Sequence, residues 1–185
     1  KEVNFLGTKN IINAIKKTGI RWFFFSSTSH VYKSTNKKIS EKSKKQPISY
    51  YGKTKLQAEN YIIKHLKKTN IKYCIGRIFS TSNKDQKKNY LVPDLKKKIK
   101  KINKKITFKN LNHYRDFISM QEISKIILIL CKKKYKGIIN IGSGKGIHLK
   151  DIAKFICEKY NKTYDFDDNE KPTYLIADNL KLRKF

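Results

Sequence analysis

The sequence predicts an α/β protein built around a parallel sheet. Short, continuous apolar runs, typical of strands buried on both faces, recur along the chain at 20–27, 71–79 and 137–144. Longer stretches with apolar residues at helical spacing separate them, and the first run ends in hydroxyl residues. Strands that alternate with helices favour a parallel sheet with crossover connections.

The first half of the chain begins with a helix over 3–19, because its apolar residues follow helical spacing and Thr18-Gly19 is a helix stop. The run IRWFFFSS at 20–27 predicts a buried strand. A polar loop then leads to a second helix at about 49–69, and IKYCIGRIF at 71–79 predicts the next strand.

The second half continues the alternation. We expect a helix near 91–101, a short strand around Ile106, an apolar helix at 120–133 and an amphipathic helix at 148–160. GIINIGSG at 137–144 predicts a strand and a turn. The last 25 residues have no clear pattern, and the chain shows no internal repeat and no clear linker.

Composition limits the functional classes. A chain of 185 residues can bury the core of one domain, and it contains no apolar run near the length of a membrane span and no signal-peptide pattern. Cys74, Cys131 and Cys157 lie far apart inside apolar stretches, which predicts buried thiols in a reducing compartment and a cytoplasmic location. The first residue is Lys1, so we interpret the chain as a fragment.

The formal charge of +30 does not by itself indicate nucleic-acid binding. Among 44 Lys and Arg residues only four are arginine, and the lysines are spread from end to end, whereas nucleic-acid binders cluster arginine and lysine. The abundance of Lys, Ile and Asn and the scarcity of Ala favour AT-rich codon bias. Basic runs such as LKKKIKKINKK at 95–105 predict exposed faces.

Tyr51 and Lys55 are the one Tyr–Lys pair with a spacing of four residues. Residues four apart share one face of a helix, so both side chains point into the same space. A free tyrosine has a pKa near 10, and a neighbouring ammonium favours the phenolate and lowers that pKa. Chance alone would produce such a pair in a lysine-rich chain, so its meaning depends on its surroundings.

Those surroundings supply a family resemblance. SSTSHVYK at 26–33 and PISYYGKTKLQAE at 47–59 resemble the extended short-chain dehydrogenase/reductase family, the NAD-dependent epimerases and dehydratases of nucleotide sugars. Further segments follow in the family's order. They are VNFLGT, GRIFS, YRDFISMQEI, IINIGSGKGIHLKDIAKFI and IADNLKLRKF, so the resemblance covers nearly the whole chain.

The resemblance implies a partial Rossmann-like parallel sheet with a small C-terminal α+β substrate-binding part. Residues 1–80 would be the remaining second half of a Rossmann-like domain with the catalytic residues. Residues 81–185 would form mostly the substrate-binding region, with 115–145 returning to the Rossmann-like part. A dinucleotide cofactor, NAD or NADP, and a nucleotide-sugar substrate are implied as well.

The resemblance also implies site residues. Tyr51, Lys55 and Thr28 match the catalytic tyrosine, lysine and hydroxyl residue. Ser26 and Ser27 match the strand end that approaches the cofactor, together with Tyr51 and Lys55; ordinary strand-end hydrogen bonding is the alternative for both serines. The general alternative for Tyr51 is an aromatic side chain that packs its helix against the sheet.

Substrate contacts are implied for Thr28, Ser80 and Arg115. Ser80 replaces the family's asparagine after Arg77. Arg115 matches an arginine that contacts the substrate's diphosphate, for which a planar guanidinium is suited; a structural ion pair with Asp116 or a neighbouring residue is its alternative. The four histidines show no metal-ligand spacing and are interpreted as exposed or structural.

The chain departs from the family in two ways that affect function. The family's glycine-rich cofactor loop is absent from these residues, so we expect the native gene product to encode it upstream and this fragment to be inactive. Ser29 and His30 follow Thr28 where 4,6-dehydratases carry Asp-Glu, which favours a 4-epimerase or keto-sugar reductase. GSGKG at 142–146 lacks the spacing of a dinucleotide loop and is interpreted as a turn near the substrate site.

Two other functions stay open. One is a non-catalytic NAD(P)-binding relative, and the other is a basic nucleic-acid-binding protein. The favoured interpretation has no specific nucleic-acid partner and no membrane partner. It implies a homodimer of the full-length protein, formed through the helices at 3–18 and 49–69.

Overall fold

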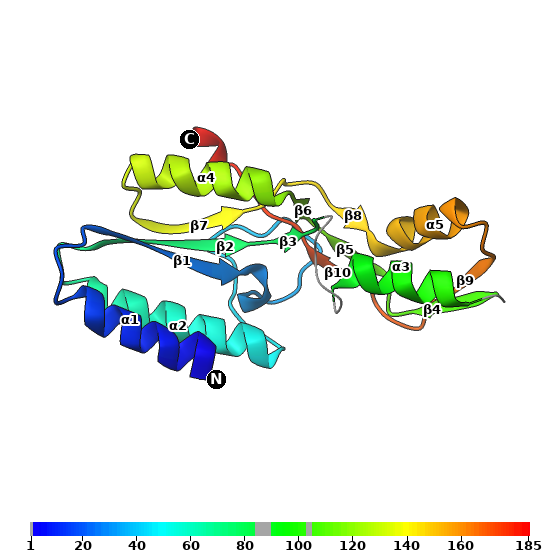
Figure 1. Cartoon of the computed structure of the whole chain (residues 1–185), viewed down its shortest axis with the longest axis horizontal. Helices are drawn as coiled ribbons and strands as arrows, with labels where there is room; N and C mark the ends of the chain where they lie inside the picture. The colour runs from blue at the N-terminus through cyan, green and yellow to red at the C-terminus, as the bar shows by residue number, and fades with distance from the viewer. Residues whose placement is uncertain (1, 84–89, 103–104) are drawn as a thin grey trace.

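The computed structural model describes residues 2–83, 90–102 and 105–185, and its main sheet has three parallel strands (Figure 1). These are β1 (Trp22–Thr28), β2 (Lys72–Ile78) and β7 (Gly137–Ile141), in the order β1-β2-β7. Their register pairs Thr28 with Ile78 and Ile78 with Ile141, so the carboxyl ends of the strands meet at one edge of the sheet. The expected α/β class with a parallel sheet is confirmed.

Helices cover both faces of this sheet, as Figure 1 shows. The π-helix η1 (Glu2–Leu6), α1 (Gly7–Ile15) and α2 (Tyr50–Leu66) lie on one face, and α4 (Met120–Lys132) lies on the other. The core on the α1/α2 face is formed by fully buried aliphatic side chains that include Ile12, Ile62 and Ile75. Burial of apolar side chains on both sides explains why the strands read as continuous apolar runs.

Local capping fixes where two of these helices begin. The Ser49 hydroxyl accepts a hydrogen bond from the Gly52 N–H (3.1 Å) and so caps α2 directly before Tyr50. At α4, Ser119 and Glu122 form a reciprocal capping box. The start of α2, and with it the place of Tyr51 in the first helical turn, is therefore set by a side-chain cap.

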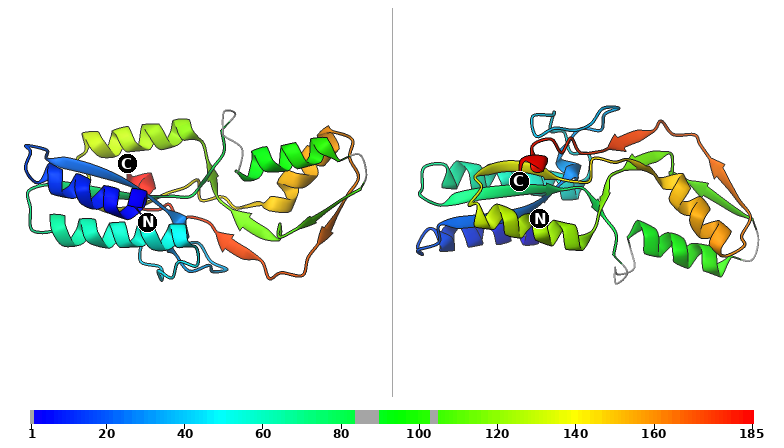
Figure 2. Two further views of the ribbon diagram at one scale, coloured as in Figure 1. Left: turned by 60° about the horizontal axis from the view of Figure 1, so that its bottom comes forward. Right: turned by 90° about the horizontal axis from the view of Figure 1, so that it is seen from above.

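A second part lies beyond one end of the main sheet, at the right of Figure 1. It contains α3 (Leu91–Lys101), α5 (Leu149–Lys159) and the parallel pair of β4 (Ile106–Lys109) and β9 (Tyr164–Asp167). Its own buried cluster includes Ile99, Phe108 and Ile156. Figure 2 shows from two further directions that this part extends away from the main sheet.

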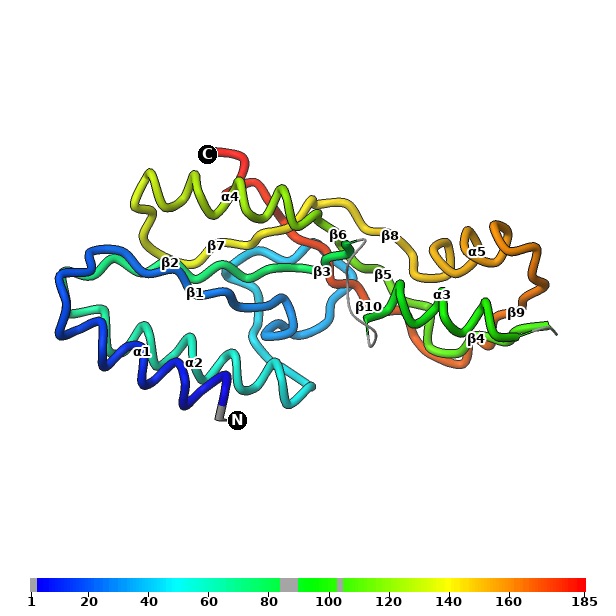
Figure 3. The backbone as a smooth tube through the Cα atoms, viewed as in Figure 1, coloured from blue at the N-terminus to red at the C-terminus, as the bar shows by residue number. Residues whose placement is uncertain are grey.

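Short strands lie between the two parts. The described residues form a sheet of β10 (Thr173–Leu175), β5 (His113–Arg115) and β8 (Ile147–His148), and a pair of β3 (Ser80–Thr81) and β6 (Phe117–Ile118). The 3-10 helices η2 (Ser29–Val31) and η3 (Leu182–Lys184) complete the elements. Figure 3 shows that the backbone passes from the main sheet to the second part and returns twice.

Some boundaries and exposures differ from the sequence-based expectations. The first helix ends at Ile15 rather than near residue 19, and its first turn is a π-helix. Cys74 and Cys157 are buried as expected, but the expectation was wrong for Cys131, which is exposed on α4. The lysines of 95–105 that the structure describes are exposed, while Leu95 and Ile99 point inward; residues 103 and 104 lie outside the described residues.

None of the helices in the described residues has the length and apolar character that a membrane span needs.

A buried ion pair links α2 to the main sheet. Glu59 and Arg77 are each about 1% exposed, and the Arg77 Nη2 lies 2.6 Å from Glu59 Oε2 while its Nε donates to Oε1 at 3.0 Å. Arg77 Nη1 also donates to the Tyr32 hydroxyl (2.7 Å), and the Ser27 hydroxyl donates to Glu59. The group therefore joins the end of β1, the following loop, α2 and β2 in one buried polar network.

Glu59→Gln is expected to destabilise the fold by about 3–5 kcal/mol, because it leaves the buried guanidinium without a counter-charge. The measurement is chemical unfolding of the variant beside the unmodified chain. Lys105→Ala serves as the control: it breaks an ion pair with Asp165 whose side chains are both more than half exposed, so no measurable change is expected. Equal, small effects in the two variants would contradict the structural role of the buried pair.

Candidate active site

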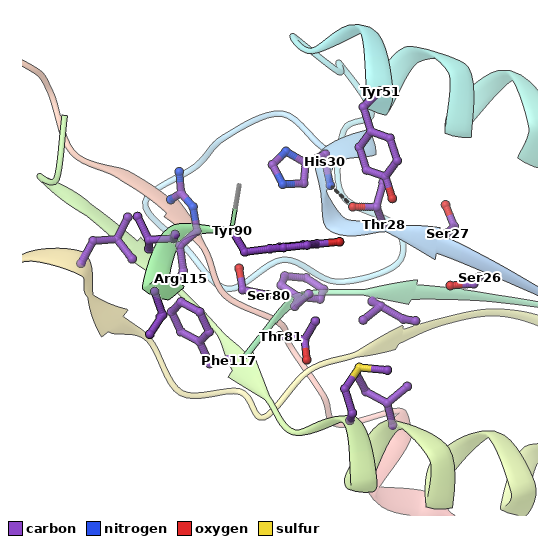
Figure 4. Close-up of a pocket in the computed structure, with 17 residues that line it drawn as sticks. Ser26, Ser27, Thr28, His30, Tyr51, Ser80, Thr81, Tyr90, Arg115 and Phe117 are labelled. Atoms are coloured by element: carbon purple, nitrogen blue, oxygen red, sulfur yellow. Dashed lines mark hydrogen bonds between the residues drawn. The ribbon is translucent and has the colours of Figure 1, made fainter. Parts of the chain in front are cut away.

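A cavity of about 590 Å³ lies at the carboxyl ends of β1 and β2, where open parallel sheets place their ligands. Figure 4 shows side chains from both parts of the molecule around it. β1 contributes Ser26, Ser27 and Thr28, and α2 contributes Tyr51. The opposite wall includes Ser80, Thr81, Tyr90, Leu91, Val92, Arg115, Phe117 and Leu149.

Tyr51 and Thr28 meet in this cavity. Thr28 is the last residue of β1, and its hydroxyl accepts a hydrogen bond from the His30 N–H (3.3 Å), drawn dashed in Figure 4. Figure 4 shows the phenol of Tyr51, a side chain that is 46% exposed, directed towards Thr28. Tyr50, the neighbouring residue, is 63% exposed and does not line the cavity. Tyr51 therefore faces the cavity and is not a buried aromatic side chain that packs α2 against the sheet.

The acidity of Tyr51 differs from the sequence-based expectation. Burial raises the pKa of Tyr51 above its ordinary value, and the neighbouring Thr28 hydroxyl lowers this pKa by less. The expected lowering of this pKa by Lys55 was wrong for the chain alone, because the ammonium is directed elsewhere. A lowering of the pKa would need a further positive charge in the cavity.

Lys55 lies one helical turn after Tyr51 but points to the strand. Its Nζ donates to the Ser26 carbonyl oxygen (2.9 Å) and lies 4.9 Å from the centre of the Phe25 ring and 6.0 Å from that of Tyr51. Partial burial lowers the pKa of Lys55, so desolvation already disfavours its charged form. Lys55 is held beside the cavity wall by backbone and aromatic contacts.

The two serines of β1 have different surroundings. Ser26 is exposed at the cavity, and its carbonyl oxygen accepts from Lys55. Ser27 is 3% exposed, and its hydroxyl donates to the buried carboxylate of Glu59. The strand-end hydrogen bonding considered as an alternative is thus present at Ser27.

Arg115 reaches the cavity from β5 without a carboxylate partner among the described residues. Its Nη1 donates to the carbonyl oxygens of Tyr114 (2.8 Å) and Thr173 (3.1 Å) and to the Thr173 hydroxyl (3.1 Å). Burial lowers the pKa of Arg115. The alternative of an ion pair with Asp116 was wrong, since Asp116 points to the other side of the strand.

Asp116 is fully buried and holds the segments behind the cavity together. Its carboxylate accepts hydrogen bonds from the N–H groups of Ser143 (2.7 Å), Gly144 (2.9 Å) and Ala177 (3.0 Å), and from the Ser143 hydroxyl (2.6 Å). Gly142 approaches so closely that an added Cβ would lie 2.7 Å from Asp116 Oδ2. The GSG segment is therefore a turn tied to Asp116, and its glycine allows this contact.

Sequence reasoning missed three cavity residues. His30 is exposed, as expected, but its ring also lines the cavity, 6.2 Å from the Tyr51 ring between centroids. Tyr90 and Phe117 also line the cavity (Figure 4). Only His30 had a usable signal, because it lies two residues after Thr28 at the end of a predicted strand.

Comparison with known proteins gives one family. Residues 1–142 match the model of the NAD-dependent epimerase/dehydratase family. GDP-6-deoxy-D-talose 4-dehydrogenase from Aggregatibacter actinomycetemcomitans is 30% identical over 175 residues, which are 91% of this chain and 58% of that protein. The dTDP-D-glucose 4,6-dehydratase of Mus musculus is 23% identical over 178 residues, covering 95% of this chain and 50% of that protein. The chain thus spans little more than half the length of these relatives.

Solved structures share the fold. A UDP-glucuronic acid 4-epimerase from Bacillus cereus, in complex with a fluorinated UDP-glucuronic acid and NAD, has a TM-score of 0.85 at 24% identity, covering 98% of this chain and 60% of that one. RMD from Pseudomonas aeruginosa, complexed with NADPH, has a TM-score of 0.87 at 18% identity, covering 99% of this chain and 66% of that one. The partial Rossmann-like fold expected from the sequence is confirmed by these likenesses.

Thr28→Val is expected to raise the pKa of Tyr51 further, because it removes the hydroxyl whose effect on that pKa opposes the effect of burial. The measurement is an NMR titration of tyrosines labelled at the ring carbon that bears the hydroxyl, with the Tyr51 signal assigned by its loss in Tyr51→Phe. Tyr50 provides the internal control, and its titration should not change. An unchanged Tyr51 pKa in the valine variant would show that the Thr28 contact has no influence on the phenol.

Proposed function

Because the chain belongs to the NAD-dependent epimerase/dehydratase family, we propose that it carries the proton-transfer site of an NAD- or NADP-dependent enzyme acting on a nucleotide sugar. The favoured activity is that of a 4-epimerase or a keto-sugar reductase. The observation that supports this most is the pair of Thr28 and Tyr51 side by side on the wall of one cavity, with Lys55 one turn further along α2.

The described residues fit the nicotinamide end of such a cofactor. Ser26 is exposed at the cavity, and the Lys55 ammonium donates a hydrogen bond to the Ser26 carbonyl oxygen (2.9 Å) at the same edge of the main sheet. We propose that Lys55 and Tyr51 hold the cofactor's ribose hydroxyls and that Ser26 and Ser27 form the strand end against it. A bound cofactor would supply the hydride acceptor and, in its oxidised form, the positive charge that favours the Tyr51 phenolate.

Tyr51 then moves the proton. In the proposed mechanism its phenolate takes the proton of a sugar hydroxyl as the carbon that bears it becomes a carbonyl, and returns a proton when the carbonyl is reduced. Thr28 donates a hydrogen bond to the same sugar oxygen, since its hydroxyl already lies beside the phenol. The same phenol would serve a 4-epimerase, by removing and returning the proton of one sugar hydroxyl, or a keto-sugar reductase, by protonating the new hydroxyl, and a bound cofactor would supply the hydride in either case.

Substrate binding is assigned to the wall opposite Tyr51. We propose that Arg115 contacts the diphosphate, because its half-buried guanidinium lacks a carboxylate partner among the described residues. Ser80 is proposed to contact the sugar from β3. Ser29 and His30 do not reproduce the carboxylate pair of the 4,6-dehydratases, which supports epimerisation or reduction over water elimination.

The larger arrangement follows from the same assignment. We propose that residues 1–80 form the Rossmann-like part, that 81–185 form mostly the substrate-binding part, and that 115–145 return to the first. This agrees with the place of β7 and α4 beside β1 and β2 in Figure 1. A homodimer through α1 and α2 and a cytoplasmic location are proposed for the full-length protein.

Tyr51→Phe in the full-length protein is expected to lower kcat by at least about 10²-fold, because it removes the proton-transfer group, while cofactor binding is largely retained. Turnover of UDP- and GDP-sugars, with NAD and NADP, and cofactor titration by fluorescence are the measurements. Tyr50→Phe is the matched control, since Tyr50 is the adjacent tyrosine and lies outside the cavity. Full activity of Tyr51→Phe would reject the catalytic role, and cofactor binding without any hydride transfer in the unmodified protein would favour a non-catalytic relative.

Because the chain has a formal charge of +30, the alternative of a nucleic-acid-binding protein can be tested by measuring DNA binding. If the lysines only cover solvated faces, binding to duplex DNA is expected to be micromolar at physiological salt, with a shallow dependence of log affinity on log salt. Filter binding or fluorescence anisotropy at several salt concentrations measures this. Submicromolar affinity with a steep slope would support a nucleic-acid-binding protein instead.

A further inference from the structure

We propose that His30 is a further substrate-contacting residue, and that its imidazole takes up a proton from solvent when the diphosphate of a nucleotide sugar binds at Arg115. This inference rests on the proposed function and adds a proton-linked step to substrate binding. No covalent bond other than the imidazole N–H forms in this step.

His30 and Arg115 separate two cavities. The cavity that contains Tyr51 and Thr28 has a neighbour of about 560 Å³, and His30 and Arg115 line both. The second cavity is also lined by Tyr32, Ser34, Ile48, Ser49, His113, Glu170, Lys171, Thr173 and Leu175. A ligand in either cavity can therefore contact both Arg115 and the His30 ring, which Figure 4 shows between Tyr51 and Arg115.

The charged and titratable groups around His30 come from several elements. Tyr51 approaches from α2, Tyr90 precedes α3, and Arg115 approaches from β5. Tyr32, His113, Glu170 and Lys171 line the second cavity with it. Glu170 is the one carboxylate in these two linings, and it lies 3.5 Å from His113 Nε2 rather than beside His30.

This arrangement leaves positive groups without a counter-charge among the described residues. The Arg115 guanidinium bonds only neutral oxygens there, and the pKa values of His30 and His113 are both lowered by burial first and by the Arg115 charge second. Both effects favour the neutral imidazole of His30. The half-buried Arg115 guanidinium is stabilised by an anion, and a diphosphate bound there brings negative charge close to His30 as well.

The sign of the linkage follows directly. A negative charge beside Arg115 cancels the repulsion that disfavours the imidazolium and adds an attraction, so the pKa of His30 rises on binding. Binding is then favoured at low pH and weakens as pH rises through the new pKa, by about tenfold for each unit of the pKa increase. The protonated ring can donate a hydrogen bond to a substrate oxygen next to Tyr51, which the neutral ring with its proton on the other nitrogen cannot.

The test uses the full chain and two probes, UDP-glucose and GDP-mannose, whose diphosphates have no proton that titrates near neutral pH. Calorimetric titration at one pH near 6.5 in PIPES and in bis-Tris gives the number of protons taken up, because the two buffers differ in ionisation enthalpy. We expect a fraction of a proton to be taken up by the unmodified chain and a clearly smaller fraction by His30→Gln, which still binds through Arg115. His113→Gln is the matched control, because His113 also faces Arg115 but has Glu170 as its partner; it should retain the uptake.

NMR titration of the histidine ring signals provides the direct readout. The His30 signal, assigned by its loss in His30→Gln, should titrate at higher pH with a probe bound than without it. Uptake of the same size in His30→Gln, or binding with no uptake in the unmodified chain, would overturn the proposal while leaving the Tyr51 chemistry intact. Absence of binding by either probe would overturn it together with the Arg115 assignment, whereas an active Tyr51→Phe protein would reject only the catalytic role.

Discussion

The buried carboxylate of Glu59 is the interaction on which the geometry of the candidate site depends. Tyr51, Lys55 and Glu59 follow one another at intervals of four residues, so they share one face of α2. Glu59 binds Arg77 of β2 and the hydroxyl of Ser27 in β1, and it therefore fixes this face against the ends of two strands. Tyr51 is brought to Thr28, the residue after Ser27, by the same helix face that the ion pair holds.

Burying charged groups is unfavourable, and this explains why the polar atoms of the network have hydrogen-bond partners. An unpaired charge in such a position would destabilise the fold by several kcal/mol, so the remaining polar atoms must also find partners. The Tyr32 hydroxyl accepts from Arg77 and donates to Asn140 Oδ1 (2.7 Å), which extends the network to β7. Burial raises the pKa of Tyr32 to about 12 despite the adjacent arginine, so this phenol stays neutral in the folded protein. Tyr32 acts within the structure, whereas Tyr51 is exposed to a cavity.

Asp116 has the corresponding role where the two parts of the molecule meet. Its carboxylate joins the turn after β7 to the segment after β10, which are about thirty residues apart in the sequence. Arg115, the preceding residue in β5, is thereby directed to the opposite side and into the cavity. An anion fixed in the interior next to a cation left open to a cavity is an arrangement that suits the binding of a negatively charged ligand.

The lysines have little part in this organisation. None of the lysines in the described residues is buried, and none of them lines the cavity that contains Tyr51. The high net charge is therefore a property of the solvated faces. The chemistry of the site depends on a few side chains placed by buried carboxylates.

The sequence by itself determined the alternation of helices and strands, the parallel main sheet and the helix face that carries Tyr51 and Lys55. Apolar runs and helical spacing are local signals that can be recognised in one sequence without a structure. The family motifs, which occur in the expected order, pointed to Tyr51 and Lys55 as well. The short strands β5, β8, β9 and β10 were not predicted, because each spans four residues or fewer and is defined by its partner rather than by its own pattern.

Only the tertiary structure decided the surroundings of each site residue. It directed Lys55 to the Ser26 carbonyl oxygen, separated Arg115 from Asp116 and placed His30 between two cavities. These outcomes depend on burial and on contacts between segments distant in sequence, which set pKa values and hydrogen-bond partners. A motif specifies which side chains are present, but desolvation and neighbouring charges decide their protonation.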